Sequence, residues 1–157
     1  MRENIVKDKS FTFAIRIVKL YQFLCAEKKE FVLSKQLLRS GTSVGAMVRE
    51  AEHAETKNDF KHKMGIAQKE INETIYWLEL LKETDYLTQE QFESINADAI
   101  EIIKLITTII KSTKANINHS SLTIKMRFTE EKLERAYSMI NAKFLMVNET
   151  AVKRINN

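Results

Sequence analysis

The sequence predicts an all-α protein: an antiparallel, up-down four-helix bundle followed by a C-terminal appendage. Its 157 residues include no proline and only three glycines, so the residues that punctuate folds with many strands and turns are scarce. Apolar residues make up 44% and charged residues 29%, which is typical of a soluble domain with one core. In four successive segments the apolar residues recur at spacings of three and four, as they do along one face of a helix.

The first two helices are predicted from apolar stripes that begin near Phe11 and Leu33. The first segment has two adjacent stripes: Phe11, Ala14, Val18, Tyr21 and Cys25, beside Phe13, Ile17, Leu20 and Leu24. The second segment has one stripe: Leu33, Leu37, Gly41, Val44, Val48 and Ala51. The connection at residues 26–30 is short, so these two helices are expected to lie antiparallel.

The third and fourth helices are predicted together with the residues at which they start. Their stripes are Phe60, Met64, Ala67, Ile71, Thr74, Leu78 and Leu81, and then Phe92, Ile95, Ala99, Ile102, Ile106 and Ile109. Thr56 with Asp59, and Thr88 with Gln91, have the spacing of a capping box, in which a threonine and a residue three positions later cap the helix start. The connection at residues 84–87 is again short, which favours an antiparallel pair.

Residues 1–117 are predicted to form the bundle, and residues 118–157 a separate C-terminal extension. Leu122, Ile124, Met126 and Phe128 alternate with polar residues, which is the period-two pattern of a short strand. A second amphipathic stretch follows: Leu133, Tyr137, Ile140, Phe144 and Val147. These patterns predict either a strand and a helix that dock on the bundle or on a neighbour, or a partly ordered tail.

The first and fourth helices carry more apolar surface than one core face requires. Beside the main stripe of the fourth helix lie further apolar residues: Ile100, Ile103, Leu105 and Ile110. A bundle in water normally presents a polar outer face, so this surplus predicts a second buried surface. Self-association of the chain is one explanation, and a thicker core beneath the tail is the other.

The stretch Gly41-Thr42-Ser43-Val44-Gly45 has the G-x-S-x-G form of a hydrolase nucleophile elbow. Such an elbow needs a strand before the serine, whereas here the helical period continues through the motif. Each glycine costs a helix about 1 kcal/mol relative to alanine, and close approach of a neighbouring helix is the usual compensation. We therefore interpret Gly41, Ser43 and Gly45 as packing residues, and the sequence predicts no catalytic residue and no enzyme activity.

Two histidines have spacings that occur in metal sites, Glu50-x-x-His53 and Asp59-x-x-His62. Di-iron bundles combine two Glu-x-x-His helices with an inward glutamate from each of the other two helices. The inward stripes of the first and fourth helices contain no carboxylate. The sequence therefore predicts no metal site and no cofactor.

A basic stripe runs along the second helix, roughly opposite its core face. It contains Lys35, Arg39 and Arg49, together with Thr42, Ala46 and His53. Lys57, Lys61 and Lys63 continue the positive charge into the first turns of the third helix. The net charge is +4, and cations at a helix start oppose the helix dipole, which favours an anionic partner such as a phosphate backbone. The alternative is a solvated face, or pairing with Glu50, Glu52 and Glu55. No aromatic residue interleaves with the stripe, so stacking on nucleic-acid bases is not predicted.

The remaining signals concern the compartment of the protein. Cys25 is the only cysteine, which excludes an internal disulfide and fits a cytoplasmic protein. Residues 1–4 lead into a charged stretch, so no signal peptide is expected. The longest apolar stretch, residues 102–110, is interrupted by polar residues, so no membrane span is expected.

With these residues in view, the chain resembles a known family. Residues 36–46, Gln-Leu-Leu-Arg-Ser-Gly-Thr-Ser-Val-Gly-Ala, followed by Arg49-Glu50-Ala51, are similar to the second helix of the four-helix-bundle proteins first named from ribosomal RNA intervening sequences. Asp59-Phe60 and residues 73–81 are similar to the third helix, and residues 11–20 to the first. The resemblance covers about residues 5–117 and leaves the tail outside.

This resemblance implies an antiparallel four-helix bundle that assembles as a homopentamer around a central channel, without enzyme activity. It also implies that Arg39, Ser43 and Glu50 act in the packing of the second helix and in subunit contacts. A relative of similar fold is the basic accessory protein of diversity-generating retroelements, which binds nucleic acid and a reverse transcriptase. Two hypotheses follow: an oligomeric accessory factor that associates with RNA or DNA, or a protein-interaction scaffold that binds no nucleic acid.

Overall fold

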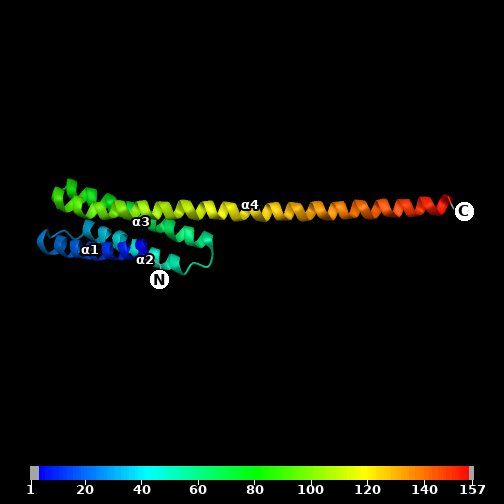
Figure 1. Ribbon diagram of the computed structural model, residues 1–157. Coiled ribbons are helices and arrows are strands. Elements are labelled where there is room, and N and C mark those ends of the chain that lie inside the picture. The colour runs from blue at the N-terminus through cyan, green and yellow to red at the C-terminus, as the bar shows by residue number, and fades with distance from the viewer. Residues whose placement is uncertain (1–3, 156–157) are drawn as a thin grey trace. The chain divides into compact units, whose positions relative to one another are not determined.

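Four helices make up the computed structural model, which describes residues 4–155, and the side chains of residues 4–135 and 138–139. They are α1 (Ile5–Glu27), α2 (Leu33–Glu52), α3 (Lys57–Glu83) and α4 (Gln89–Ile155) (Figure 1). Residues 4–155 contain no strand. The chain divides into two units, Met1–Ala115 and Asn116–Asn157. The first unit contains α1, α2, α3 and the first part of α4, and it confirms the all-α bundle.

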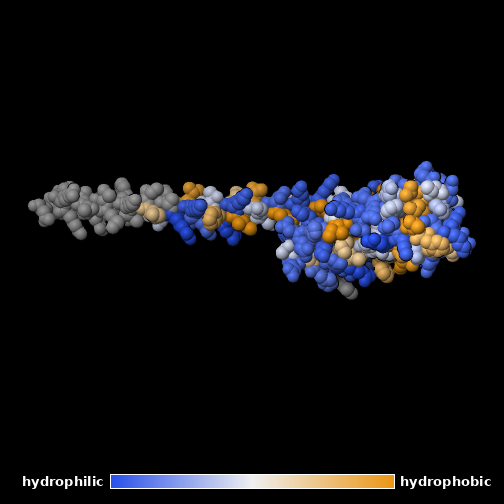
Figure 2. Space-filling view, turned by 180° about the vertical axis from the view of Figure 1, so that it is seen from behind, coloured by the Kyte–Doolittle hydropathy of each residue, from blue (hydrophilic) through white to orange (hydrophobic). Residues whose placement is uncertain are grey.

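The core of the first unit is built from the stripes that the sequence predicts. Its fully buried side chains come from all four helices: Phe13, Ile17, Leu24, Leu37, Val44, Met64, Ile71, Leu78, Leu81, Ile102 and Ile106. The stripe of α1 that begins at Phe11 behaves differently, because Phe11 and Val18 are 51% and 38% exposed. Hydrophobic residues therefore also lie on the surface of this unit (Figure 2).

One polar contact lies inside this core, between α2 and α3. The hydroxyl of Thr74 donates to the hydroxyl of Ser40 at 3.0 Å, and Ser40 donates in turn to the carbonyl of Gln36 at 3.1 Å. Both side chains are buried. Because each hydroxyl has a partner, the pair avoids the cost of an unsatisfied polar group in an apolar interior.

Side-chain caps fix where α3 and α4 begin. The Thr56 hydroxyl accepts from the backbone N–H of Asp59 at 3.0 Å, and the Thr88 hydroxyl accepts from that of Gln91 at 3.2 Å. The Gln91 side chain accepts from the N–H of Thr88 at 3.0 Å, which completes a reciprocal capping box. Both predicted helix starts are thus confirmed.

The start of α2 depends on a residue that sequence reasoning missed. Glu30 is only 6% exposed, and its carboxylate accepts backbone N–H groups of Val32 at 2.9 Å, Leu33 at 2.8 Å and Ser34 at 2.7 Å. Burial alone would raise the pKa of the Glu30 carboxyl, but these three backbone donors hold the pKa below its ordinary value. Lys29, with φ of 52°, turns the chain just before it. Glu30 therefore serves as the cap of α2.

The helices α1 and α2 approach each other closely at Gly41. A Cβ atom at this position would lie 2.8 Å from both Cγ1 and Cγ2 of Ile17, which is too close for any real contact. At Gly45 the nearest atom to such a Cβ would be the backbone oxygen of Ser10, at 3.4 Å. The absence of a side chain at Gly41 is thus what admits Ile17 to the core.

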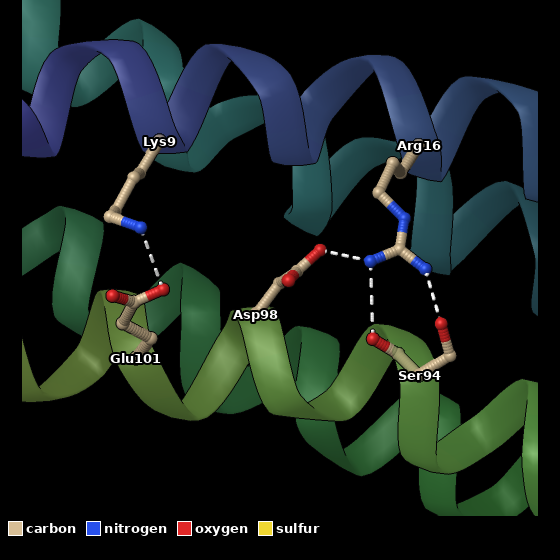
Figure 3. Close-up of polar contacts among 5 residues, drawn as sticks. All are labelled: Lys9, Arg16, Ser94, Asp98 and Glu101. Atoms are coloured by element: carbon tan, nitrogen blue, oxygen red, sulfur yellow. Dashed lines mark hydrogen bonds and ion pairs between the residues drawn. The ribbon is translucent and has the colours of Figure 1, made fainter.

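A polar edge joins α1 to the first part of α4 (Figure 3). The guanidinium of Arg16 donates to the Asp98 carboxylate and to both the carbonyl and the hydroxyl of Ser94, at 3.1 and 2.7 Å. About two turns earlier on α1, the Lys9 ammonium lies 2.9 Å from the Glu101 carboxylate. These groups are partly exposed, so each pair contributes little to stability, but together they fix which faces of α1 and α4 meet.

The second unit differs from the prediction of a strand. Residues 122–128 belong to α4, which is helical as far as Ile155. A strand must pair with a neighbour, whereas a helix satisfies its backbone groups within its own segment. No glycine or proline follows Gly65, and the leucine, methionine, lysine and arginine of this segment favour helix. In the predicted amphipathic stretch, Leu133 is 66% exposed, and the side chains of the other four members lie outside the described residues: Tyr137, Ile140, Phe144 and Val147.

Candidate nucleic-acid interface

The basic stripe of α2 lies on its outer face. Lys35, Arg39 and Arg49 are all exposed, as are Ala46 and His53, whereas Thr42 is half-buried. Among the residues whose side chains the structure describes, none of the three cations lies within 4.0 Å of a carboxylate. Their charge is therefore available to an external anion.

The acidic residues near the stripe are engaged elsewhere. Glu52 accepts from the Lys7 ammonium at 2.7 Å and from the Asn4 amide at 2.8 Å, and the hydrogen bond from Lys7 lowers the pKa of its carboxyl. Glu50 lies 2.7 Å from the ammonium of Lys63. These contacts explain why Glu50 and Glu52 leave the arginines of α2 without an acidic partner.

The three lysines of α3 are not equivalent. Lys63 is bound to Glu50, and this hydrogen bond raises the pKa of the Lys63 ammonium. Lys57 is exposed and Lys61 half-buried, and within the described part of the chain neither forms an ion pair. Both lie in the first two turns of α3, where a positive charge opposes the helix dipole and where a bound anion would relieve that opposition.

An aromatic ring lies against the stripe, but it comes from a different helix. The guanidinium carbon of Arg49 lies 4.9 Å from the centre of the Phe11 ring of α1, in cation–π geometry. Phe11 is 51% exposed, and Ile15 and Val18 of the same helix are 43% and 38% exposed. The spacing of these three residues is visible in the sequence, whereas the contact with Arg49 is created by packing and leaves no sequence signal.

The residues predicted to serve packing are distributed as follows. Gly41 is buried against Ile17, and Gly45 faces the Ser10 backbone. Ser43 lies half-buried inside the uninterrupted helix α2, with helix rather than strand before it. Glu50 is exposed and joins α2 to α3 through Lys63. The arrangement at Ser43 lacks the strand-to-helix turn on which a nucleophile elbow is built.

Other kinds of site find little support in the described residues. Both His53 and His62 are exposed, and no group of three or more His, Cys, Asp or Glu side chains in the described part of the chain could hold a metal ion. A search of the same residues finds no helix with the length and apolar character needed to cross a membrane. The basic face of α2 is thus the feature that most clearly suggests a ligand.

Comparison with known proteins identifies the family to which this bundle belongs. Residues 2–108 match the family described as 23S rRNA-intervening sequence protein. A crystal structure of a protein of unknown function from the S23 ribosomal protein family, from Bacteroides thetaiotaomicron, is 64% identical, with a TM-score of 0.67. That match covers 68% of this chain and 98% of the other. No curated protein matches the chain. The chain therefore belongs to the 23S rRNA-intervening sequence protein family.

Proposed function

We propose that this protein is a non-enzymatic, cytosolic accessory factor that oligomerises and binds nucleic acid through the outer face of α2 and the start of α3. The observation that carries the proposal is the set of cations without an acidic partner among the described residues: Lys35, Arg39, Arg49, Lys57 and Lys61. Such cations release condensed counterions when they bind phosphates, which is the main source of affinity in non-specific complexes. The family description refers to ribosomal RNA, which makes RNA the first ligand to test.

Binding is expected to fall steeply as salt rises. For RNA and duplex DNA titrated by fluorescence anisotropy, the logarithm of affinity should fall linearly with the logarithm of salt concentration. Replacing Lys35, Arg39 and Lys61 together with glutamate should weaken binding at low salt by about tenfold or more, because several phosphate contacts become repulsive.

The matched control reverses three exposed lysines on other faces of the first unit, Lys69, Lys104 and Lys111. This variant has the same net charge as the test variant but leaves the basic stripe intact. An equal loss in both variants would show that only net charge matters, and an absence of binding at low salt would overturn the proposal altogether.

A protein-interaction scaffold is the second candidate, favoured by the exposed apolar residues Phe11, Ile15 and Val18 of α1. On this hypothesis the stripe serves solubility alone. A partner captured after nuclease treatment, and still captured by the variant with reversed charges, would support the scaffold over the nucleic-acid factor.

We expect the same apolar residues to be covered in an oligomer. Light scattering at micromolar concentration should give a mass well above the 18.3 kDa of one chain. Replacing Phe11 and Val18 with aspartate should lower that mass, because charged groups would then have to be desolvated between copies. Thr12→Asp alters an exposed polar residue of the same helix and should leave the mass unchanged. A wild-type mass of one chain would contradict oligomerisation.

A further inference from the structure

The helical segment 116–135 of the second unit carries a narrow apolar stripe outside the residues matched by the family. Leu122 and Met126 are both 60% exposed, and Leu133 is 66% exposed. With Thr129 they follow spacings of four, three and four residues, so they lie along one line of the helix surface. Hydrophobic side chains are thus exposed along this segment between hydrophilic ones (Figure 2).

The spacing of this stripe is that of a coiled-coil seam. With Met126 and Leu133 at a positions, Leu122 and Thr129 take d positions of the heptad. The hydroxyl of Thr129 donates to the carbonyl of Lys125 at 2.8 Å, so its polar atom is satisfied and its methyl group remains available for packing. Helix propensity alone stabilises a helix only marginally, and most helical stability in proteins comes from packing an apolar face. Pairing along the seam would bury its exposed apolar side chains.

The other apolar residues of the segment lie away from this line. Ile124 and Phe128 occupy the f and c positions, which face outward in a coiled coil. The Lys132 ammonium lies 4.9 Å from the centre of the Phe128 ring, which is itself 60% exposed. Leu122, Met126, Thr129 and Leu133 thus form the line on which a partner helix would pack.

The charges beside the seam identify both the partner and its direction. Lys125 and Lys132 occupy successive g positions, and Glu130 occupies the e position between them. In a parallel pair of identical helices, a g residue faces the e residue five positions later on the other copy, so Lys125 meets Glu130. In an antiparallel pair g faces g, and lysine would meet lysine. We propose that residues 122–133 pair with the same residues of a second copy as a parallel, in-register coiled coil.

Disulfide trapping in the full chain tests this proposal. In a Cys25→Ser background, Met126→Cys places one thiol per chain at an a position, where parallel in-register helices bring like residues within about the 4.4–6.8 Å between Cα atoms that a disulfide needs. Mild oxidation should give a covalent dimer of two 18.3 kDa chains. Ile124→Cys at the f position is the matched control, and its dimer should form at least about tenfold more slowly.

Charge reversal tests the register independently of folding. Glu130→Lys should slow trapping by the Met126→Cys chain, and adding Lys125→Glu should restore it, because the pair then carries its charges in exchanged positions. Equal trapping at positions 124 and 126 would overturn the proposal, as would a failure of Met126→Cys to cross-link. Oligomerisation of the first unit raises trapping at both positions alike, so it does not change the ratio between them.

Discussion

Replacing Glu30 with alanine is expected to lower the free energy of unfolding by about 2–4 kcal/mol, because three backbone N–H groups at the start of α2 lose their acceptor at once. Glu30 is 6% exposed, so water is poorly placed to take over this role. The N-cap position itself, Val32, provides no side-chain acceptor. Urea unfolding of the full chain, followed by circular dichroism, measures the loss.

The pH dependence of this loss identifies the charged form as the cap. The pKa of Glu30 is lower in the fold than in the unfolded chain, where it is about 4.3. Its stabilisation is therefore fully present above about pH 4.3 and is lost as pH falls through the lower folded pKa. Glu30→Gln, which keeps the shape but does not titrate, is the reference. The stability difference between wild type and Glu30→Gln should be constant near neutral pH and shrink in acid. A difference independent of pH would rule out the carboxylate as the cap.

Alanine at Gly41 is expected to destabilise the protein by about 1–3 kcal/mol, although alanine is the better helix former by about 1 kcal/mol. The new Cβ would lie 2.8 Å from two branch carbons of Ile17, a side chain with no exposed surface and so no room to move. Either α1 or α2 must shift, and the core loses contacts on both. Thermal and urea unfolding both report this change.

Gly45→Ala is the matched control for Gly41→Ala, one helical turn along the same face. Its Cβ would meet the Ser10 backbone at an ordinary 3.4 Å, so the gain in helix propensity should leave the variant as stable as wild type or up to about 1 kcal/mol more stable. If both alanine variants behaved alike, the close approach of α1 to Gly41 would be excluded as the reason for the glycine.

The sequence predicts the bundle well because helical period and burial coincide there. Leu37, Val44 and Val48 are buried as their spacing predicts, and Thr56 and Thr88 cap the helices that follow them. Alternation in residues 122–128 misleads because a period of two indicates a strand only when one face of it is buried. In an exposed helix the same alternation has no structural consequence, and propensity decides.

For the candidate interface, what lies on one helix is predictable and what joins two helices is not. The positions of Lys35, Arg39 and Arg49 follow from the geometry of α2 alone. The ring of Phe11 beneath Arg49 and the ion pair between Glu50 and Lys63 depend on how the helices pack. The capping role of Glu30 is not predictable from the sequence for another reason. Glu30 lies in the turn two residues before the N-cap position of α2, and that position is occupied by Val32 rather than by a serine, threonine or aspartate.

The buried contact between Ser40 and Thr74 has a consequence for the outside of the molecule. Sliding α2 along α3 by one turn, about 5.4 Å, would break the hydrogen bond between Thr74 and Ser40, so this contact favours one register of the two helices. Glu50 and Lys63 lie on the same two helices, and in this register their charged groups are 2.7 Å apart. The buried hydroxyls of Ser40 and Thr74 thus help to set where the charged side chains of α2 and α3 lie relative to one another on the outside of the bundle.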